Sequence, residues 1–112
     1  MLSLKNRLKK KKDFEWVFKK GKSFRDGFLS LRLVENNLKT SRFAFVVSLK
    51  VSKKATLRNK LKRGLKKTIK ANLPRIKTGF DVMLTAIPGL EKQSQEQIKE
   101  TTEIVLKKAE LI

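Results

Sequence analysis

The chain has 112 residues, which is enough for one domain and too few for two independently folding cores. It contains neither cysteine nor histidine, so disulfides and thiolate metal sites are excluded, and the commonest general base and zinc ligand are missing. Lysine and arginine number 29 against 10 aspartate and glutamate residues, a net charge of +19. This composition disfavours a conventional protein hydrolase and favours one domain over residues 1–112.

Residues 1–12 are predicted to form a basic N-terminal arm with Leu2, Leu4 and Leu8 as its apolar anchors. The arm lacks the apolar segment of a secretion signal. No apolar run in the chain approaches the roughly 20 residues that a membrane-spanning helix needs. We therefore expect a cytoplasmic protein without a membrane partner.

A short helix is predicted to follow the arm. Asp13 is a suitable N-cap, because its carboxylate can accept a free backbone N–H of the first turn. Phe14, Val17 and Phe18 then fall on one helical face. Gly21 is expected to end the helix, since glycine readily adopts the left-handed conformation found after many helices.

The segment from 22 to 49 is predicted to form strands. Residues 28–34 alternate partly between apolar and polar side chains, and Asn36-Asn37 is a turn signal. Residues 43–49 are almost continuously apolar, which is typical of a strand in the middle of a sheet. Residues 22–25 give a weaker strand signal.

The longest predicted helix covers residues 55–73. Its apolar stripe repeats every four residues and consists of Leu57, Leu61, Leu65 and Ile69, with Thr68 beside it and Leu73 at its end. The following Pro74 ends the pattern. A further strand is expected at 80–87, where Pro88-Gly89 stops it.

The last predicted element is a helix that begins with a capping box formed by Ser94 and Gln97. Its expected buried stripe is Ile98, Thr101, Val105 and Ala109, with Thr102 and Leu106 at the margin. The complete order, with the weak strand included, is α-β-β-β-α-β-α. That order predicts an α+β fold with a largely antiparallel sheet.

The charge of the chain is unevenly placed. Residues 1–80 carry 25 basic and 4 acidic side chains, whereas residues 81–112 carry 4 basic and 6 acidic ones. So large an excess of one sign repels itself in the folded state unless a polyanion neutralises it. We therefore predict a nucleic-acid partner; the alternative is a soluble surface that is merely rich in lysine.

The strongest local signal is the polar surface of the helix at 55–73. Between Glu35 and Asp81 the chain has 14 basic residues and no acid. Like charges four residues apart, as at Arg58 and Lys62, cost about 0.2–0.5 kcal/mol per pair in an isolated helix. Phosphates between the cations would offset this cost. We predict that RNA contacts Arg58, Asn59, Lys60, Lys62, Arg63, Lys66 and Lys67; the alternative is a solvated basic face.

The aromatic residues of the first helix leave two interpretations open. Phe14 and Phe18 fit the core, and beside so many cations they also fit a surface that stacks on unpaired bases. Trp16 lies off their face, either exposed or at an edge of the core. Asp81 is most simply a salt-bridge or turn partner of a neighbouring lysine. Because paired carboxylates, a glycine-rich phosphate loop and metal-ligand spacing are all missing, we predict no catalytic and no metal-binding side chain.

Several segments resemble the bacterial ribonuclease P protein family. Leu57-Arg58-Asn59-Lys60-Leu61-Lys62-Arg63 resembles the Arg-Asn-Arg signature helix of that family. The family's N-terminal pattern is matched by Asn6-Arg7-Leu8, Asp13-Phe14, Val17-Phe18 and Gly21. Val47-Ser48-Leu49-Lys50 resembles the family's Val-Ser-Lys-Lys strand end, and Phe80-Asp81-Val82 with Pro88 resembles its last strand. The resemblance covers about residues 4–108.

The resemblance implies an α-β-β-β-α-β-α two-layer sandwich, like the second domain of a small-subunit ribosomal protein, with a left-handed β-α-β crossover. General rules would instead favour a right-handed crossover. It also implies a protein subunit, monomeric in the holoenzyme, that assists an endoribonuclease in the 5′ maturation of tRNA. In this family the RNA subunit cleaves the bond and holds the magnesium ions, so no cofactor is expected on protein side chains.

The resemblance assigns the signature helix to the ribonuclease P RNA. It assigns Phe14, Phe18, Ser48 and Lys50 to a cleft that binds the single-stranded 5′ leader of precursor tRNA. The chain departs from the family pattern at four positions: Lys60 replaces the second arginine of the signature, Leu49 a usual lysine, Ile87 a frequent arginine, and Leu31 an aromatic residue that faces the leader. Lys60 keeps the charge and loses the planar fork of arginine.

Two other classes of function compete with this interpretation. A ribosomal or other structural RNA- or DNA-binding module would share the basic helix and the fold. A self-sufficient protein nuclease is disfavoured, since the chain has no histidine and no carboxylate cluster.

Overall fold

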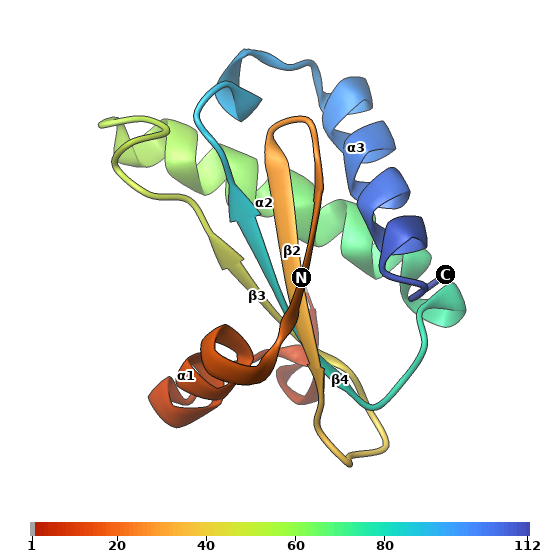
Figure 1. Ribbon diagram of the computed structural model, residues 1–112. Coiled ribbons are helices and arrows are strands. Elements are labelled where there is room, and N and C mark those ends of the chain that lie inside the picture. Colours follow the sequence, from red (N-terminus) through yellow and green to blue (C-terminus); the bar gives the residue numbers. More distant parts are fainter. Residues whose placement is uncertain (1) are drawn as a thin grey trace.

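The computed structural model describes residues 2–112. Over these residues the helices are α1 (Lys11–Lys20), α2 (Ala55–Asn72) and α3 (Gln95–Lys108), and the strands are β1 (Lys22–Asp26), β2 (Leu29–Glu35), β3 (Arg42–Val46) and β4 (Phe80–Ala86). The order α1-β1-β2-β3-α2-β4-α3 confirms the predicted α+β class (Figure 1). The weak strand signal at 22–25 is therefore a real strand, β1.

The four strands form one mixed sheet in the order β1-β2-β4-β3. The pairs β1–β2 and β2–β4 are antiparallel, and β3–β4 is parallel. In Figure 1, β3 lies to the left of β4, both strands point upward, and α2 passes behind the sheet. The β3-α2-β4 connection is therefore left-handed, against the general preference and in agreement with the family resemblance.

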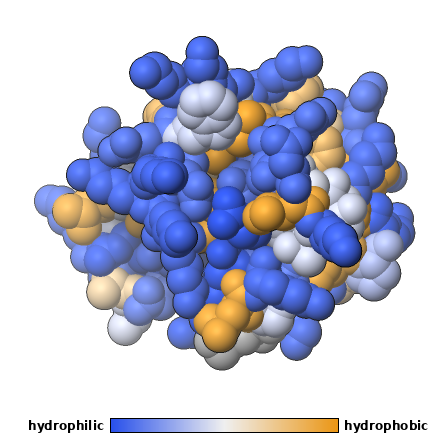
Figure 2. Space-filling view, turned by 90° about the horizontal axis from the view of Figure 1, so that it is seen from below, coloured by the Kyte–Doolittle hydropathy of each residue, from blue (hydrophilic) through white to orange (hydrophobic). Residues whose placement is uncertain are grey.

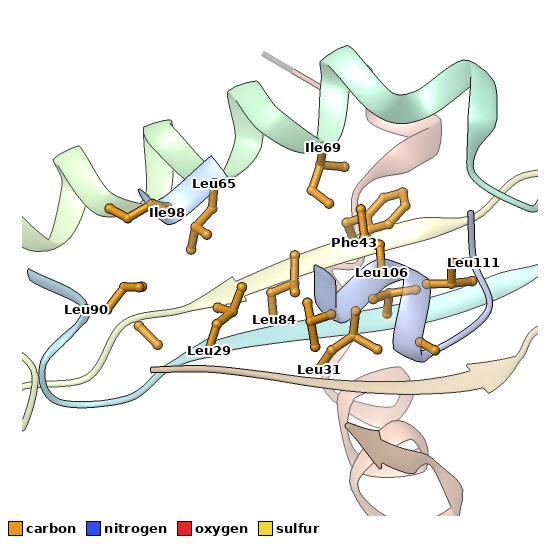
Figure 3. Packing of buried hydrophobic residues seen from close by; sticks show 14 of the residues in the cluster. Leu29, Leu31, Phe43, Leu65, Ile69, Leu84, Leu90, Ile98, Leu106 and Leu111 are labelled. Atoms are coloured by element: carbon orange, nitrogen blue, oxygen red, sulfur yellow. The ribbon is translucent and has the colours of Figure 1, made fainter. Parts of the chain in front are cut away.

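The main core lies between the sheet and the pair α2 and α3. The side chains Leu29, Leu31 and Leu84 of the sheet and Leu65 and Ile69 of α2 are each fully buried or nearly so. Figure 3 shows Leu65 and Ile69 of α2 pointing toward the sheet, with Leu106 and Leu111 closing the same layer. These two layers form the predicted sandwich, and the four-residue repeat of α2 is what buries its leucines.

The opposite face of the sheet is covered only in part, by α1 and the N-terminal arm. Leu8, Val17, Ala44 and Met83 form a second, smaller apolar cluster there. The arm continues the sheet at the edge of β3: Arg7 pairs in parallel with Phe43, and the N–H of Leu8 donates to the carbonyl of Phe43 at 2.9 Å. The rest of this face is not covered by α1 or by the arm.

The start of α1 differs from the prediction. Its N-cap is Lys10, so Asp13 is the third residue of the helix and not its cap. The carboxylate of Asp13 lies 3.4 Å from a guanidinium nitrogen of Arg42 on β3. An acid in the first turn also favours the positive end of the helix dipole. Asp13 thus ties α1 to the sheet.

Gly21 ends α1 as predicted, for a different reason. Its φ of −72° is not left-handed. A Cβ at this position would lie 2.3 Å from the carbonyl oxygen of Val17 and 3.1 Å from that of Leu33. Glycine is therefore needed chiefly because the last turn of α1 leaves no room for a Cβ, and the backbone of β2 tightens the site further.

The capping box of α3 is confirmed. The Ser94 hydroxyl accepts from the backbone of Gln97 at 3.1 Å, and the side chain of Gln97 accepts from the Ser94 backbone at 2.9 Å. The predicted stripe is shifted: Thr102 and Leu106 are fully buried at its centre, whereas Thr101 is only half-buried. A polar residue, Thr102, sits there because its hydroxyl donates to the carbonyl of Ile98 at 2.7 Å.

Among residues 2–112, no helix combines the length and the apolar composition of a membrane span.

Candidate nucleic-acid interface

The seven polar residues singled out on α2 do not share one face. Arg58, Lys62 and Lys66 follow one another every four residues along one flank and are half-buried. The remaining four residues of the set are exposed, namely Asn59, Lys60, Arg63 and Lys67. At 100° per residue, Asn59 and Arg63 lie on the outermost surface of the helix, opposite the leucine stripe. The helix therefore presents cations on its outer face and on the flank toward β3.

Arg58 has a structural role in addition to its charge. Its Nη1 donates to the carbonyl oxygen of Ser52 at 2.9 Å, which fixes the turn that leads into α2. Arg63 is exposed on the outer face. The two arginines of the signature segment are therefore not equivalent, although both lie off the leucine stripe as predicted.

A second candidate surface is the part of the sheet that α1 leaves open. Successive side chains of a strand alternate between the two faces of a sheet. Ser30, Thr85 and Val46 are aligned across β2, β4 and β3 and lie on the α1 face. All three are half-buried, whereas Met83 and Ala44, one row nearer α1, are buried. We call this uncovered strip of the sheet, with the neighbouring side of α1, the groove.

Phe14 and Phe18 border this groove in different ways. Phe14 is half-buried and packs against the small apolar cluster under α1. Phe18 is 64% exposed, so it is a surface residue and not part of the core. The guanidinium carbon of Arg32 lies 5.4 Å from the centre of the Phe18 ring, and its Nη2 donates to the Phe18 carbonyl at 2.6 Å. Arg32 therefore holds the ring of Phe18 at the end of α1.

The other two residues assigned to the leader, Ser48 and Lys50, lie in the exposed turn after β3. Val46 packs against the same apolar cluster as Phe14. Ser48 follows Val46 by two residues, so the turn starts close to that cluster. Phe18 lies toward the other side of the sheet, beside Arg32 of β2. The four residues thus extend across the open face from β3 to β2 and do not form one compact pocket.

The structure shows where the four residues lie that depart from the family pattern. Leu31 is fully buried in the main core, so it cannot face a ligand on the α1 side; its neighbour Arg32 occupies that face. Leu49 is 65% exposed and Lys60 is exposed, whereas Ile87 is half-buried after the end of β4. Leu31 therefore does not lie on the face that the resemblance assigns to the leader.

Asp81 is the partner of an arginine and not of a lysine. Arg42 donates from Nε and Nη2 to the two carboxylate oxygens of Asp81 at 2.8 and 2.7 Å, and Asn36 donates to the same carboxylate at 2.9 Å. The hydrogen bonds from Arg42 to Asp81 raise the pKa of Arg42, and partial burial opposes the change. Together with Asp13, this network fixes α1 against β3 and β4, and so sets one wall of the groove.

The end of the molecule that carries α1 and the β2–β3 loop is strongly polar. Figure 2, seen from the side of α1 and the β2–β3 loop, shows hydrophilic residues over most of this face with scattered apolar side chains between them. Trp16 is 50% exposed, so of its two interpretations the exposed one is correct. The Lys20 ammonium lies 6.0 Å from the centre of the Trp16 ring. At 100° per residue, Trp16 lies on the far side of α1 from Phe18.

Sequence reasoning missed Arg32, Ser30 and Thr85 as residues of the groove. A signal for the first two was present, because Ser30 and Arg32 alternate with three leucines in residues 29–33. That alternation marks them as the face of β2 opposite the core. Thr85 carried no comparable signal in the nearly continuous apolar run of β4.

Comparison with known proteins identifies the family. The family model described as Ribonuclease P matches residues 2–110. The ribonuclease P protein component of Alkaliphilus metalliredigens is 34% identical over 107 residues, covering 96% of each chain. The RNase P protein of Staphylococcus aureus is 30% identical, with a TM-score of 0.89 over 95% of this chain and 96% of that one. The RNase P protein of Thermotoga maritima is 31% identical, with a TM-score of 0.83 over 91% and 96%. A sequence match over nearly the whole chain, with the same fold, shows that this chain belongs to the ribonuclease P protein family.

Proposed function

We propose that this chain binds the RNA subunit of ribonuclease P through α2 and the 5′ leader of precursor tRNA through the groove beside α1, and so assists the removal of the leader. In this proposal the RNA subunit, with its magnesium ions, breaks the phosphodiester bond. The protein contributes binding and orientation as a monomer of the cytoplasmic holoenzyme. Membership of the family supports the subunit role.

The observation that carries the proposal is the separation of two surfaces with different chemistry. The outer face of α2 offers cations and an amide, which suits the phosphates of a folded RNA. The groove offers an exposed aromatic ring, Phe18, beside Arg32, and a half-buried row of Ser30, Thr85 and Val46. Aromatic rings stack on unpaired bases and suit a single strand. Two RNAs can therefore be held at once.

Reconstitution tests the proposal. The protein is added to a bacterial ribonuclease P RNA with precursor tRNA at low magnesium, and the rate of 5′ cleavage is measured with and without the protein. We expect the protein to stimulate cleavage and to raise affinity for precursor tRNA more than for mature tRNA, which has no leader. Stimulation would be lacking for a structural RNA-binding module, and cleavage by the protein alone would require a nuclease site in the chain.

A further inference from the structure

A cleft lies at the edge of β3, between the N-terminal arm and α2, and adjoins the leader groove at Phe14. Its volume is about 230 Å³. The arm contributes Arg7 and Lys9, and α2 contributes Lys62 and Lys66. We call it the arm cleft.

The ionisable side chains that line the arm cleft, among residues 2–112, are these four cations. Each of Arg7, Lys62 and Lys66 is half-buried, so their charges are less well solvated than those of free surface lysines. Four cations around one cleft repel one another, and a bound anion offsets that repulsion. The charge of the cleft therefore matches a phosphate.

The arm is held in place by specific contacts, so the cleft exists before any ligand arrives. Asn6 is buried and donates from its side chain to the carbonyl of Ser41 at 2.9 Å. Arg7 donates from Nε to the carbonyl of Leu2 at 2.9 Å, which leaves its two terminal nitrogens for other partners. The parallel pairing of Arg7 with Phe43 completes the attachment.

The size and walls of the cleft restrict its occupant further. Its volume is below the range of about 300–1,000 Å³ that is usual for drug-sized ligands. Its apolar walls include Phe14, Phe43 and Phe45. One base with its phosphate suits such a site, since the aromatic walls accept the base and the cations accept the phosphate.

We propose that the arm cleft binds one unpaired nucleotide of the RNA subunit, with its phosphate among Arg7, Lys9, Lys62 and Lys66. The inference rests on the proposed function, because α2 supplies half of the cations and is the helix assigned to the RNA subunit. The N-terminal arm thereby becomes part of the interface with that RNA.

Two double variants with equal loss of charge test the inference. Lys9→Ala with Lys66→Ala removes one cleft cation from each element. The control, Lys5→Ala with Lys70→Ala, removes exposed lysines of the same arm and the same helix that lie outside the cleft. Affinity of each full-length protein for a bacterial ribonuclease P RNA is measured over a range of salt concentrations.

We expect the cleft variant to bind the RNA at least about tenfold more weakly at physiological salt and to lose up to about 0.7–0.9 from the log–log salt slope, as the loss of one phosphate contact predicts. The control should lose less than about threefold. Equal losses for the two variants would mean that only total charge matters and would overturn the inference. Failure of the unaltered protein to bind the RNA would instead overturn the proposed function.

A cross-linking experiment identifies the occupant. Because the chain has no cysteine, Lys9→Cys provides a single thiol for a short photoactivatable cross-linker. In the assembled holoenzyme with precursor tRNA, we expect the cross-links to fall on an unpaired nucleotide of the RNA subunit. Cross-links confined to the leader, or spread along a double-helical backbone, would overturn the inference.

Discussion

Replacing Phe18 by alanine separates the roles of the aromatic residues on α1. The side chain is 64% exposed, so only about a third of its surface is buried. Full burial of a phenylalanine contributes about 1.5–3 kcal/mol, which sets the cost of Phe18→Ala to the free energy of unfolding at roughly 1 kcal/mol. For a domain of this size the Tm should fall by about 5 °C.

The effect on leader binding should be larger. Stacking on one base contributes about 1–3 kcal/mol by alanine substitution, which corresponds to an affinity about 5- to 150-fold weaker. The assay is the affinity of the reconstituted holoenzyme for precursor and for mature tRNA, with a melting curve of the free protein. Only the affinity for precursor tRNA should change, because mature tRNA has no leader.

Two variants of the same helix serve as controls. Trp16→Ala removes an exposed aromatic from the other side of α1 and should leave both affinities nearly unchanged. Val17→Ala removes methyl groups from a fully buried residue and should lower the Tm and the activity toward every RNA equally. If Phe18→Ala instead behaves like Val17→Ala, with equal loss for both RNAs, the groove does not bind the leader through this ring.

Three further predictions concern charge. Affinity for the RNA subunit should fall steeply with salt, with a log–log slope of about −0.7 to −0.9 for each phosphate contact, and a nearly flat dependence would refute phosphate neutralisation. Arg63→Ala should weaken RNA binding without changing the Tm. Arg58→Ala should also lower stability by about 1 kcal/mol, because it removes the hydrogen bond to Ser52; thermal melts of the two variants would show equal Tm values if this distinction is wrong. Asp81→Ala should cost roughly 3 kcal/mol by leaving Arg42 without its bidentate partner, and urea unfolding that shows less than about 1 kcal/mol would contradict this role.

The sequence allowed much of the fold to be predicted because its local signals agree with the tertiary structure. The four-residue repeat of α2 and the Ser94–Gln97 capping box place two helices almost to the residue. The errors lie where long-range contacts decide. Asp13 binds Arg42 on β3 and does not cap α1. Gly21 is required because a Cβ would clash with the Val17 carbonyl and crowd that of Leu33 on β2, and not because of a left-handed φ.

The candidate site was predicted less completely than the fold. Charge density alone indicated α2, but only the packing shows that Lys62 and Lys66 face the arm while Arg63 faces outward. Phe18 had two interpretations because its spacing from Phe14 is the same for a core and for a surface. The sheet resolves it, since β2 places Arg32 beside the ring at the end of α1.

The position of β4 in the sheet governs when the protein can fold during synthesis. β4 is the last strand to be made, yet it lies between β2 and β3 and pairs with both. A ribosome that has not yet released residue 86 from its exit tunnel carries β3 and α2 without the strand that joins them to the β1–β2 hairpin. Because these pairings join residues as far apart in the chain as Leu29 and Ala86, they form late and cooperatively. The cationic first 80 residues therefore emerge before they can fold, close to ribosomal RNA, and the nearly complete chain closes its sheet in a single step.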